Sequence, residues 1–295
     1  MKKLIIPFIL LSAGHIIFAF EVDTAGHHWP QNLIYGMILR IYYESHILEN
    51  RGAITSPGRG DILGLQNTIR VEVPSPGKIS RIDLIGYYED VDLEGNGLYK
   101  QWHYGYHKGE IYHHMGSLTT SMIKPACELE WNTGWIPDQS GQMKIAARIV
   151  RKDGYIYLTE TVRDLTLDRP GMSVELCKPY NQPEGWFTRE GAFREHFRIS
   201  GDLQQAVAAK MVFRSWSPGY FNGIYINDFL VFIREGPRYD YFEHHIPIHE
   251  MHVFEQGDNT LKTGKTPRYH GEMVHGVEVQ WPGIMVLVRY ELNQP

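Results

Sequence analysis

Cysteine is scarce in this chain of 295 residues, which contains only Cys127 and Cys177. At most one disulfide can therefore brace the fold. Such a bridge would close a loop of about 50 residues and contribute about 4 kcal/mol in the chain-entropy description. The sequence does not show that the two residues meet, so a bridge and two free thiols both remain open.

Long apolar runs and basic tracts are also missing. After the N-terminal region no stretch approaches the roughly 18 apolar residues of a membrane helix, so we expect no membrane span. The formal net charge is -5 and no basic tract or stripe occurs, which argues against a nucleic-acid partner. The hydrophobic fraction of 43% is still high enough to form a real core and to exclude a disordered chain.

Familiar catalytic motifs do not occur either. The chain has no G-x-S-x-G elbow, no P-loop and no G-x-G-x-x-G. Paired carboxylates of a glycoside hydrolase leave no such signature, because they need only spatial proximity. The sequence therefore favours a non-catalytic protein without deciding whether it is an enzyme.

The N-terminus has the organisation of a secretory signal peptide. Lys2 and Lys3 precede the apolar segment Leu4 to Leu11, and small residues follow. We predict a signal peptide over residues 1–19, with cleavage after Ala19; cleavage after Gly14 is the alternative. The expected location is secreted, periplasmic or on the cell surface.

The rest of the chain consists of short segments typical of strands. In TIRVEV, apolar and charged residues alternate, as expected for a half-buried strand. Similar segments recur, among them MKIAARIV, GIYIND and IMVLVRYEL. The best helix candidate, Ser200 to Lys210, is short and equally fits the start of a strand. We therefore predict an all-β fold of two packed β-sandwich domains.

A boundary between the two domains is predicted at LDRPG, where Pro170 and Gly171 end a strand-like segment. The predicted organisation is an N-terminal arm over 20–36, a first sandwich over 37–168 and a second over 172–295. No low-complexity linker separates the two domains, so we expect them to pack against each other.

The first domain resembles the bacterial immunoglobulin-like modules that are attached to secreted enzymes. The resemblance rests on IDLIGYY, on Trp131-Asn132-Thr133, on MKIAARIVRKDG and on TVRDLTL, which follow one another in the order of those modules. It covers about residues 39–167 and implies an immunoglobulin-like β-sandwich. The long insertion after Tyr88 departs from the minimal module.

The second domain resembles galactose-binding-like jelly rolls, the fold of many carbohydrate-binding modules. The residues that carry the resemblance are IYIND, Ile224 to Asp228, and QGDNTLKTG, Gln256 to Gly264. It implies a jelly roll but no particular ligand, because that fold hosts many functions.

Abundant aromatic residues make carbohydrate the predicted ligand. Aromatic residues form 13% of the chain, and the C–H faces of sugars stack on aromatic rings. Packing of the β-sandwich cores is the alternative explanation for these rings. The candidate ligand-binding residues are Trp102, Trp186, Trp216, Tyr220, Asn222 and Tyr225.

The segment DVDLEGNG predicts a structural calcium site. Its acids alternate in a glycine-containing turn, which can direct several oxygens to one point, as Ca²⁺ requires. It resembles the front half of an EF-hand loop but lacks the closing bidentate Glu. A solvated acidic turn is the alternative. The candidate ligands are Asp90, Asp92, Glu94 and Asn96.

Two further hypotheses come from other residues. A glycan- or glycopeptide-acting hydrolase would use a groove between the sandwiches, an arrangement similar to bacterial peptide-N-glycanase; the candidates are Asp138, Glu130, Trp102 and His103. A copper or zinc site would use the histidines of YFEHHIPIHEMHVF, where a structural or surface role is the alternative: His244, His245, His249 and His252.

Overall fold

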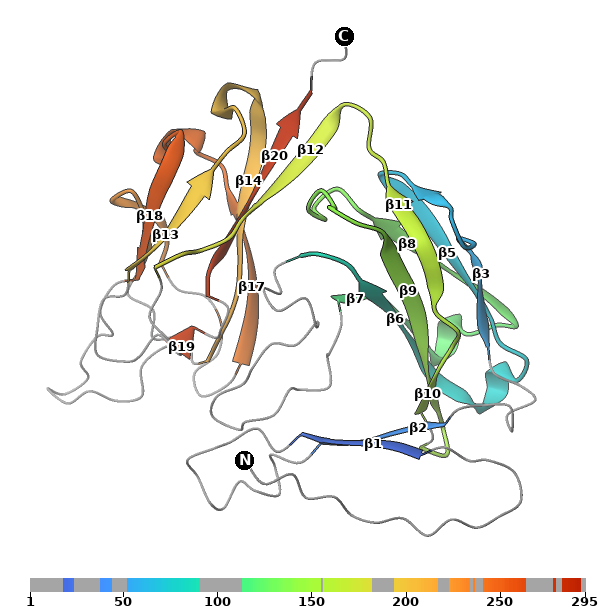
Figure 1. Ribbon diagram of the computed structural model, residues 1–295. Helices are drawn as coiled ribbons and strands as arrows, with labels where there is room; N and C mark the ends of the chain where they lie inside the picture. The colour runs from blue at the N-terminus through green and yellow to red at the C-terminus, as the bar shows by residue number, and fades with distance from the viewer. Residues whose placement is uncertain are drawn as a thin grey trace, which may run out of the picture.

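The computed structural model describes residues 18–23, 38–43, 52–90, 113–154, 156–181, 194–216, 223–233, 236, 241–263, 278–279 and 283–292. Strands form nearly all of the regular structure in these ranges, and the described helical elements are single 3-10 turns. The all-β prediction is confirmed. Two β-sandwiches stand side by side, and the chain passes between them where β11 leads into β12 (Figure 1).

The first sandwich packs a six-stranded sheet against a three-stranded sheet. The six-stranded sheet has the order β4-β11-β9-β6-β7, with β10 paired to β9. Its strands are β4 (Ile62–Leu63), β6 (Ile79–Tyr87), β7 (His113–Thr119), β9 (Met143–Arg151), β10 (Ile156–Leu158) and β11 (Val162–Leu167). The three-stranded sheet, in the order β3-β5-β8, contains β3 (Ala53–Ser56), β5 (Gln66–Glu72) and β8 (Ala126–Asn132).

The second sandwich packs a five-stranded sheet against a four-stranded sheet. The five-stranded sheet has the order β12-β20-β14-β17, with β19 paired to β14. Its strands are β12 (Met172–Cys177), β14 (Ala206–Trp216), β17 (Tyr241–Ile248), β19 (Glu278–Val279) and β20 (Met285–Glu291). The four-stranded sheet, in the order β13-β18-β15-β16, contains β13 (Arg194–Ile199), β15 (Ile224–Ile226), β16 (Phe229–Phe232) and β18 (Gly257–Thr263).

A further strand pair lies near the N-terminus, where β1 (Phe18–Asp23) is antiparallel to β2 (Ile38–Tyr43). β1 spans the predicted cleavage position after Ala19, and of the predicted arm only residues 20–23 are described. Signal-peptide cleavage stays a prediction. In the described residues we find no helix with the length and apolar character needed to cross a membrane.

The segment expected to be helical or the start of a strand contains both a turn and a strand. Asp202 accepts a hydrogen bond from the backbone N–H of Gln204 and so caps the 3-10 turn η4 (Leu203–Gln205). β14 begins directly after this turn at Ala206. The other 3-10 turns in the described ranges are η2 (Pro76–Lys78), η3 (Thr120–Met122) and η6 (Met251–Val253).

Each sandwich encloses its own core, and one cysteine lies in each. Cys127 is buried among the residues of the first core, and Cys177 among those of the second. Both are free thiols. Burial raises the pKa of the Cys177 thiol, so this side chain stays protonated. Of the two alternatives left open by the sequence, the structure contains two free thiols.

Trp135 joins the two sandwiches. It extends from the first sandwich onto the outer face of the five-stranded sheet of the second, where it packs with four buried residues: Val174, Val212, Met285 and Leu287. The ammonium nitrogen of Lys210 lies 4.8 Å from the centre of its ring, and the guanidinium carbon of Arg289 lies 5.0 Å from it. The contact is therefore filled by an aromatic ring held by apolar packing and two cations.

Candidate functional site

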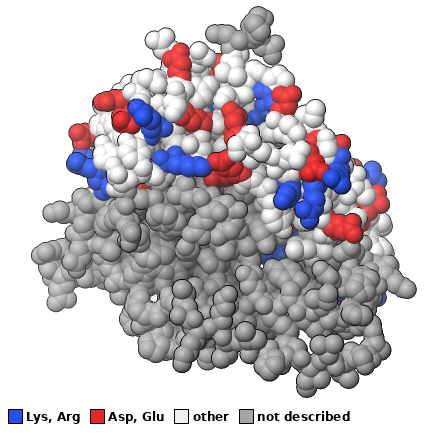
Figure 2. Space-filling view, viewed as in Figure 1, with Lys and Arg blue, Asp and Glu red and all other residues white. Residues whose placement is uncertain are grey.

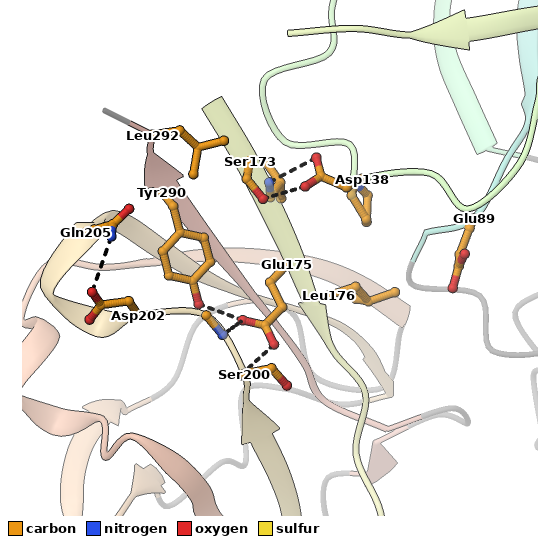
Figure 3. Close-up of a pocket in the computed structure, with 13 residues that line it drawn as sticks. Glu89, Asp138, Ser173, Glu175, Leu176, Ser200, Asp202, Gln205, Tyr290 and Leu292 are labelled. Carbon is orange, nitrogen blue, oxygen red and sulfur yellow. Dashed lines mark hydrogen bonds between the residues drawn. The ribbon is translucent and has the colours of Figure 1, made fainter. Parts of the chain in front are cut away.

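A cavity of about 440 Å³ lies at the junction of the sandwiches (Figure 3). This cavity corresponds to the groove that the hydrolase hypothesis requires, because acidic side chains from both domains line it. Glu89 and Asp138 belong to the first sandwich, and Glu175 and Asp202 to the second. Whether these acids can act on a ligand depends on what already binds them.

The two acids of the second sandwich are bound by neighbouring protein groups. Glu175 accepts hydrogen bonds from the backbone N–H groups of Ser200 at 2.7 Å and Gly201 at 3.1 Å, and from the Tyr290 hydroxyl at 2.6 Å (Figure 3). Burial, together with the neighbouring Glu175, raises the pKa of Tyr290 and keeps its hydroxyl protonated as a donor. Asp202 caps η4 as described above. Both carboxylates therefore hold a turn in place.

Asp138 has a structural role at the connection between the two sandwiches. The buried Arg169 donates to Asp138 at 2.6 Å and also to the carbonyl oxygens of Thr133 and Ile136. Ser173 and the backbone N–H of Val174 donate to the same carboxylate. Asp138 thus fixes the connection between the domains rather than presenting a free acid.

Glu89 and Glu130 complete the acids that bear on the hydrolase hypothesis. Lys178 donates to Glu89 at 2.6 Å, and this hydrogen bond is the main cause of a lowered Glu89 pKa, so the group is ionised rather than a proton donor. Glu130 lies outside the cavity lining, exposed on β8, where Thr68 donates to it at 2.8 Å. The structure therefore does not bring Glu130 together with Asp138. Trp102 and His103 lie outside the described residues.

Buried polar residues inside the second sandwich include Glu195 of β13, Ser215 of β14 and His244 of β17. His244 has its Nε2 atom 2.9 Å from the Ser215 hydroxyl and its ring stacked on Phe213. Burial, with a smaller contribution from His245, lowers the pKa of His244 to about 4, so the ring is neutral at physiological pH. Glu195 accepts one hydrogen bond, from the N–H of Ile284, and its other oxygen has no hydrogen-bond partner among the described residues.

The histidine segment does not form a metal site with the described residues. His244 points into the core, whereas His245 lies outside and contacts Glu243 at 2.8 Å; His252 pairs with Glu250. Among the ranges that the structure describes, no three His, Cys, Asp or Glu side chains are grouped so that they could hold a metal ion. A structural or surface role fits these histidines.

Most of the predicted ligand and calcium residues lie in segments outside the described ranges. Asp92, Glu94, Asn96, Trp102, Trp186, Tyr220 and Asn222 lie outside the described residues. Asp90 is described, and its charge partly offsets the lowering of the Lys210 pKa by burial. Trp216 is the last residue of β14, where it pairs with Tyr241. Calcium binding and these sugar contacts stay predictions.

Tyr225 is described, and it lies on an outward polar surface of the four-stranded sheet. The outward side chains of β13 pair in register with those of β18: Arg194 with Lys262, His196 with Thr260, and Arg198 with Asp258. Tyr225 pairs with Lys262 from the other side. We define the tyrosine face by these side chains together with Tyr180 and Asp228.

Tyr180 places a second ring on this face. Its backbone forms a bridge to His196, and its ring centroid lies 5.7 Å from that of His196. The Tyr180 hydroxyl donates to Asp258 at 3.0 Å, and the residue is 38% exposed. From the Tyr180 segment to β15 is three strand spacings, or about 14 Å. This is a backbone separation, and the Tyr180 side chain extends from its segment to Asp258 on β18.

The motifs quoted for the jelly-roll resemblance build one side of this face. Asn227 and Asp228 both have positive φ and form the two-residue turn between β15 and β16. Asn227 donates to the Asn259 side-chain oxygen at 2.6 Å and accepts from the N–H of Thr260. These hydrogen bonds fix the turn and so position Asp228 to bind Lys262. The Lys262 ammonium nitrogen lies 5.7 Å from the centre of the Tyr225 ring.

Sequence reasoning missed Tyr180, His196 and the charged residues around them. In REHFRI, the apolar residues Phe197 and Ile199 point into the sandwich. Side chains alternate along a strand, so Arg194, His196 and Arg198 point outward. That signal was present in the sequence. The pairing of this strand with β18, which gathers the side chains into one surface, is not encoded locally.

Comparisons with known proteins do not identify a family. No family model matches the sequence, and no curated protein matches it. A structure of Clostridium thermocellum CbhA fibronectin(III)-like modules is similar over 66% of this chain and 78% of that chain, with 13% identity and a TM-score of 0.25. Wild-type BuGH86 in complex with neoagarooctaose is similar over 78% of this chain, with 10% identity and a TM-score of 0.32; this chain spans 33% of that protein. These scores do not establish a shared fold.

Proposed function

We propose that this chain is a secreted, non-catalytic carbohydrate-binding protein whose contact surface is the tyrosine face. The observation that carries the proposal is the pair of tyrosine rings, Tyr180 and Tyr225, on one sheet surface with His196, Thr260 and Asp258 around them. The immunoglobulin-like and galactose-binding-like assignments of the two sandwiches belong to the same proposal and rest on the sequence motifs.

The chemistry of a sugar chain fits this surface. A pyranose has apolar C–H faces that stack on rings, and a rim of hydroxyl groups that exchange hydrogen bonds with polar side chains. Rings that come from segments on the two sides of the β13–β18 pair suit an oligosaccharide better than a single sugar. Stacking on one or two rings predicts micromolar to millimolar affinity.

The distribution of charge argues against a nucleic-acid site. On the side of the molecule shown in Figure 2, the basic side chains of the described residues are interspersed with acidic ones. A nucleic-acid site would instead gather Lys and Arg into a patch or stripe.

Export and calcium are further parts of the proposal. The N-terminal sequence supports secretion, and the acidic segment that begins at Asp90 supports a structural Ca²⁺ site. The hydrolase alternative also stays a prediction. The described acids of the interdomain cavity give it no free carboxylic acid, because each accepts hydrogen bonds from protein donors.

Affinity electrophoresis of the full chain through gels containing neutral and charged polysaccharides tests the function. Replacement of the ring in Tyr225→Ala should weaken binding about tenfold, which corresponds to about 1.4 kcal/mol. Tyr180→Ala should have a similar effect. Phe242→Ala removes an exposed ring from the opposite sheet and serves as the matched control. Equal mobility of wild type and both tyrosine variants in every gel would contradict the proposal.

A further inference from the structure

The tyrosine face carries more positive than negative charge, although the chain as a whole is acidic. Its basic residues are Arg194, Arg198 and Lys262, and its carboxylates are Asp228 and Asp258. The formal net charge of the whole chain is -5. A local excess of cations on an acidic protein suggests a ligand that carries negative charge.

Two of the three cations are already paired. Lys262 binds Asp228, and the Arg198 guanidinium lies 3.5 Å from Asp258. Arg194 is exposed, and within the described part of the chain it makes no hydrogen bond or ion pair. Its charge acts on Asp228: the Lys262 hydrogen bond is the largest cause of the lowered Asp228 pKa, and the charges of Lys262 and Arg194 lower it further. The guanidinium of Arg194 is therefore available to a ligand.

The position of Arg194 relates it directly to the Tyr225 ring. Arg194 pairs with Lys262, and Lys262 pairs with Tyr225, so the three residues form one row across three adjacent strands. Two strand spacings, about 10 Å, separate the two ends of the row. An arginine side chain is long enough to meet a substituent of a sugar that rests on the ring or of the next sugar in the chain.

We infer that the carbohydrate bound at the tyrosine face is anionic, with a sugar ring on Tyr225 and a carboxylate or sulfate group on Arg194. Guanidinium binds both groups by two parallel hydrogen bonds, and this geometry separates arginine from lysine. The inference rests on the proposed function and adds the class of polysaccharide. Uronic acids and sulfate esters share this chemistry, and the experiment separates them.

The test measures affinity of the full chain for three polymers: polygalacturonate, which carries carboxylates, λ-carrageenan, which carries sulfate esters, and galactomannan, which is neutral. At least one anionic polymer should bind about tenfold more tightly than galactomannan. Raising the salt to about 1 M should remove most of that difference, because the Debye length then falls to about 3 Å.

Three variants assign the effect to Arg194. Arg194→Gln should weaken binding of the preferred anionic polymer about tenfold and should weaken galactomannan binding much less. Arg194→Lys should recover only part of the affinity, since lysine keeps the charge without the two parallel bonds. Arg163→Gln is the matched control, because Arg163 is an exposed strand arginine of the first sandwich. Unchanged thermal midpoints confirm that the variants are folded.

The outcomes separate this inference from the function on which it rests. Equal affinity for galactomannan and both anionic polymers, lost in Tyr225→Ala but not in Arg194→Gln, would overturn the anionic ligand and keep the carbohydrate function. Equal losses in Arg194→Gln and Arg163→Gln would show non-specific attraction and would also overturn the inference. Binding to none of a broad polysaccharide panel would overturn both.

Discussion

Glu195 is unusual because its carboxyl group lies among core side chains and, within the described ranges, only one of its oxygens accepts a hydrogen bond. Burial raises its pKa from the usual 4.5 to about 8. Over the pH range between those values, the folded chain keeps a proton that the unfolded chain releases. The free energy of unfolding should therefore fall as the pH rises through this range.

Glu195→Gln should remove this dependence, since the amide keeps the shape of the side chain and stays neutral. At about pH 5 the variant and the wild type should unfold at similar temperatures, whereas at about pH 9 the variant should be more stable by a few kcal/mol. Thermal unfolding followed by circular dichroism measures both. A difference that is constant with pH would contradict the assignment of a proton to buried Glu195.

The residue scale also shows what the sequence could and could not predict. Phe197 and Ile199 of REHFRI point inward, and Glu195 lies two residues before Phe197, so alternation along the strand predicts that Glu195 also points inward. The hydrogen bond from Ile284 and the contact of His244 with Ser215 come from residues distant in sequence, and no local pattern indicates them. Of the predicted ligand residues, only Tyr225 has a described side chain on the candidate surface.

At the scale of elements, β6 shows how a strand can be buried on both faces. Its outward residue Asp83 has a side chain only 3% exposed, and Arg148 of β9, Arg81 and Ser117 of β7 bind it. Burial raises the Asp83 pKa, but the hydrogen bonds from Ser117 and Arg148 and the charges of both arginines outweigh it, so the pKa lies below its usual value. The carboxylate is therefore a stabilising link across three strands.

Asp83→Asn should lower the free energy of unfolding by about 3 kcal/mol at neutral pH, because two arginines lose their anionic partner. The stabilisation that a lowered pKa provides is present above the usual value and disappears as the pH falls through the folded value. The difference between variant and wild type should therefore shrink at about pH 3.

Urea unfolding at the two pH values checks this expectation. Asp153→Asn is a suitable control, because Asp153 forms an ion pair with Arg151 in an exposed hairpin and should matter by less than about 1 kcal/mol. Equal effects of the two substitutions would contradict the central role assigned to Asp83.

Alternating sequence patterns explain why the strands were easier to predict than the strands with which they pair. TIRVEV alternates as expected, and Ile69 and Val71 are buried while Arg70 and Glu72 are exposed. In β6, however, Asp83 interrupts the apolar sequence, and its role depends on the register with β7 and β9. Register between distant strands is a tertiary property, so sequence periodicity predicts the strands without predicting their order in the sheets.

At the scale of the whole molecule, Trp135 couples the two sandwiches. The sequence lacks a flexible linker, which predicted packed domains, but no local pattern in it indicates that Trp135 makes the contact. Its ring packs on Val212 and Leu287 and lies close to Lys210 and Arg289. The two cores are otherwise separate, so this contact is the apolar link between them, beside the polar links of Asp138 to Ser173 and of Glu89 to Lys178.

Trp135→Ala should uncouple the unfolding of the sandwiches. Removal of the ring leaves apolar surface of both domains exposed and should cost about 3–5 kcal/mol of coupling. Differential scanning calorimetry should then resolve two transitions where the wild type shows one. Trp131→Ala provides the contrast: Trp131 lies inside the first core and the Trp135 contact is kept, so its loss should lower the single shared transition without dividing it. A single transition in Trp135→Ala would contradict the coupling role.

The two sulfhydryl groups have a consequence for how the chain matures. Cys127 and Cys177 are enclosed in different hydrophobic interiors, so neither can reach the other, and neither is open to small oxidants. Folding therefore consumes no oxidising equivalents and requires no disulfide isomerase. The native state should assemble equally well in a reducing cytosol and in an oxidising extracellular medium.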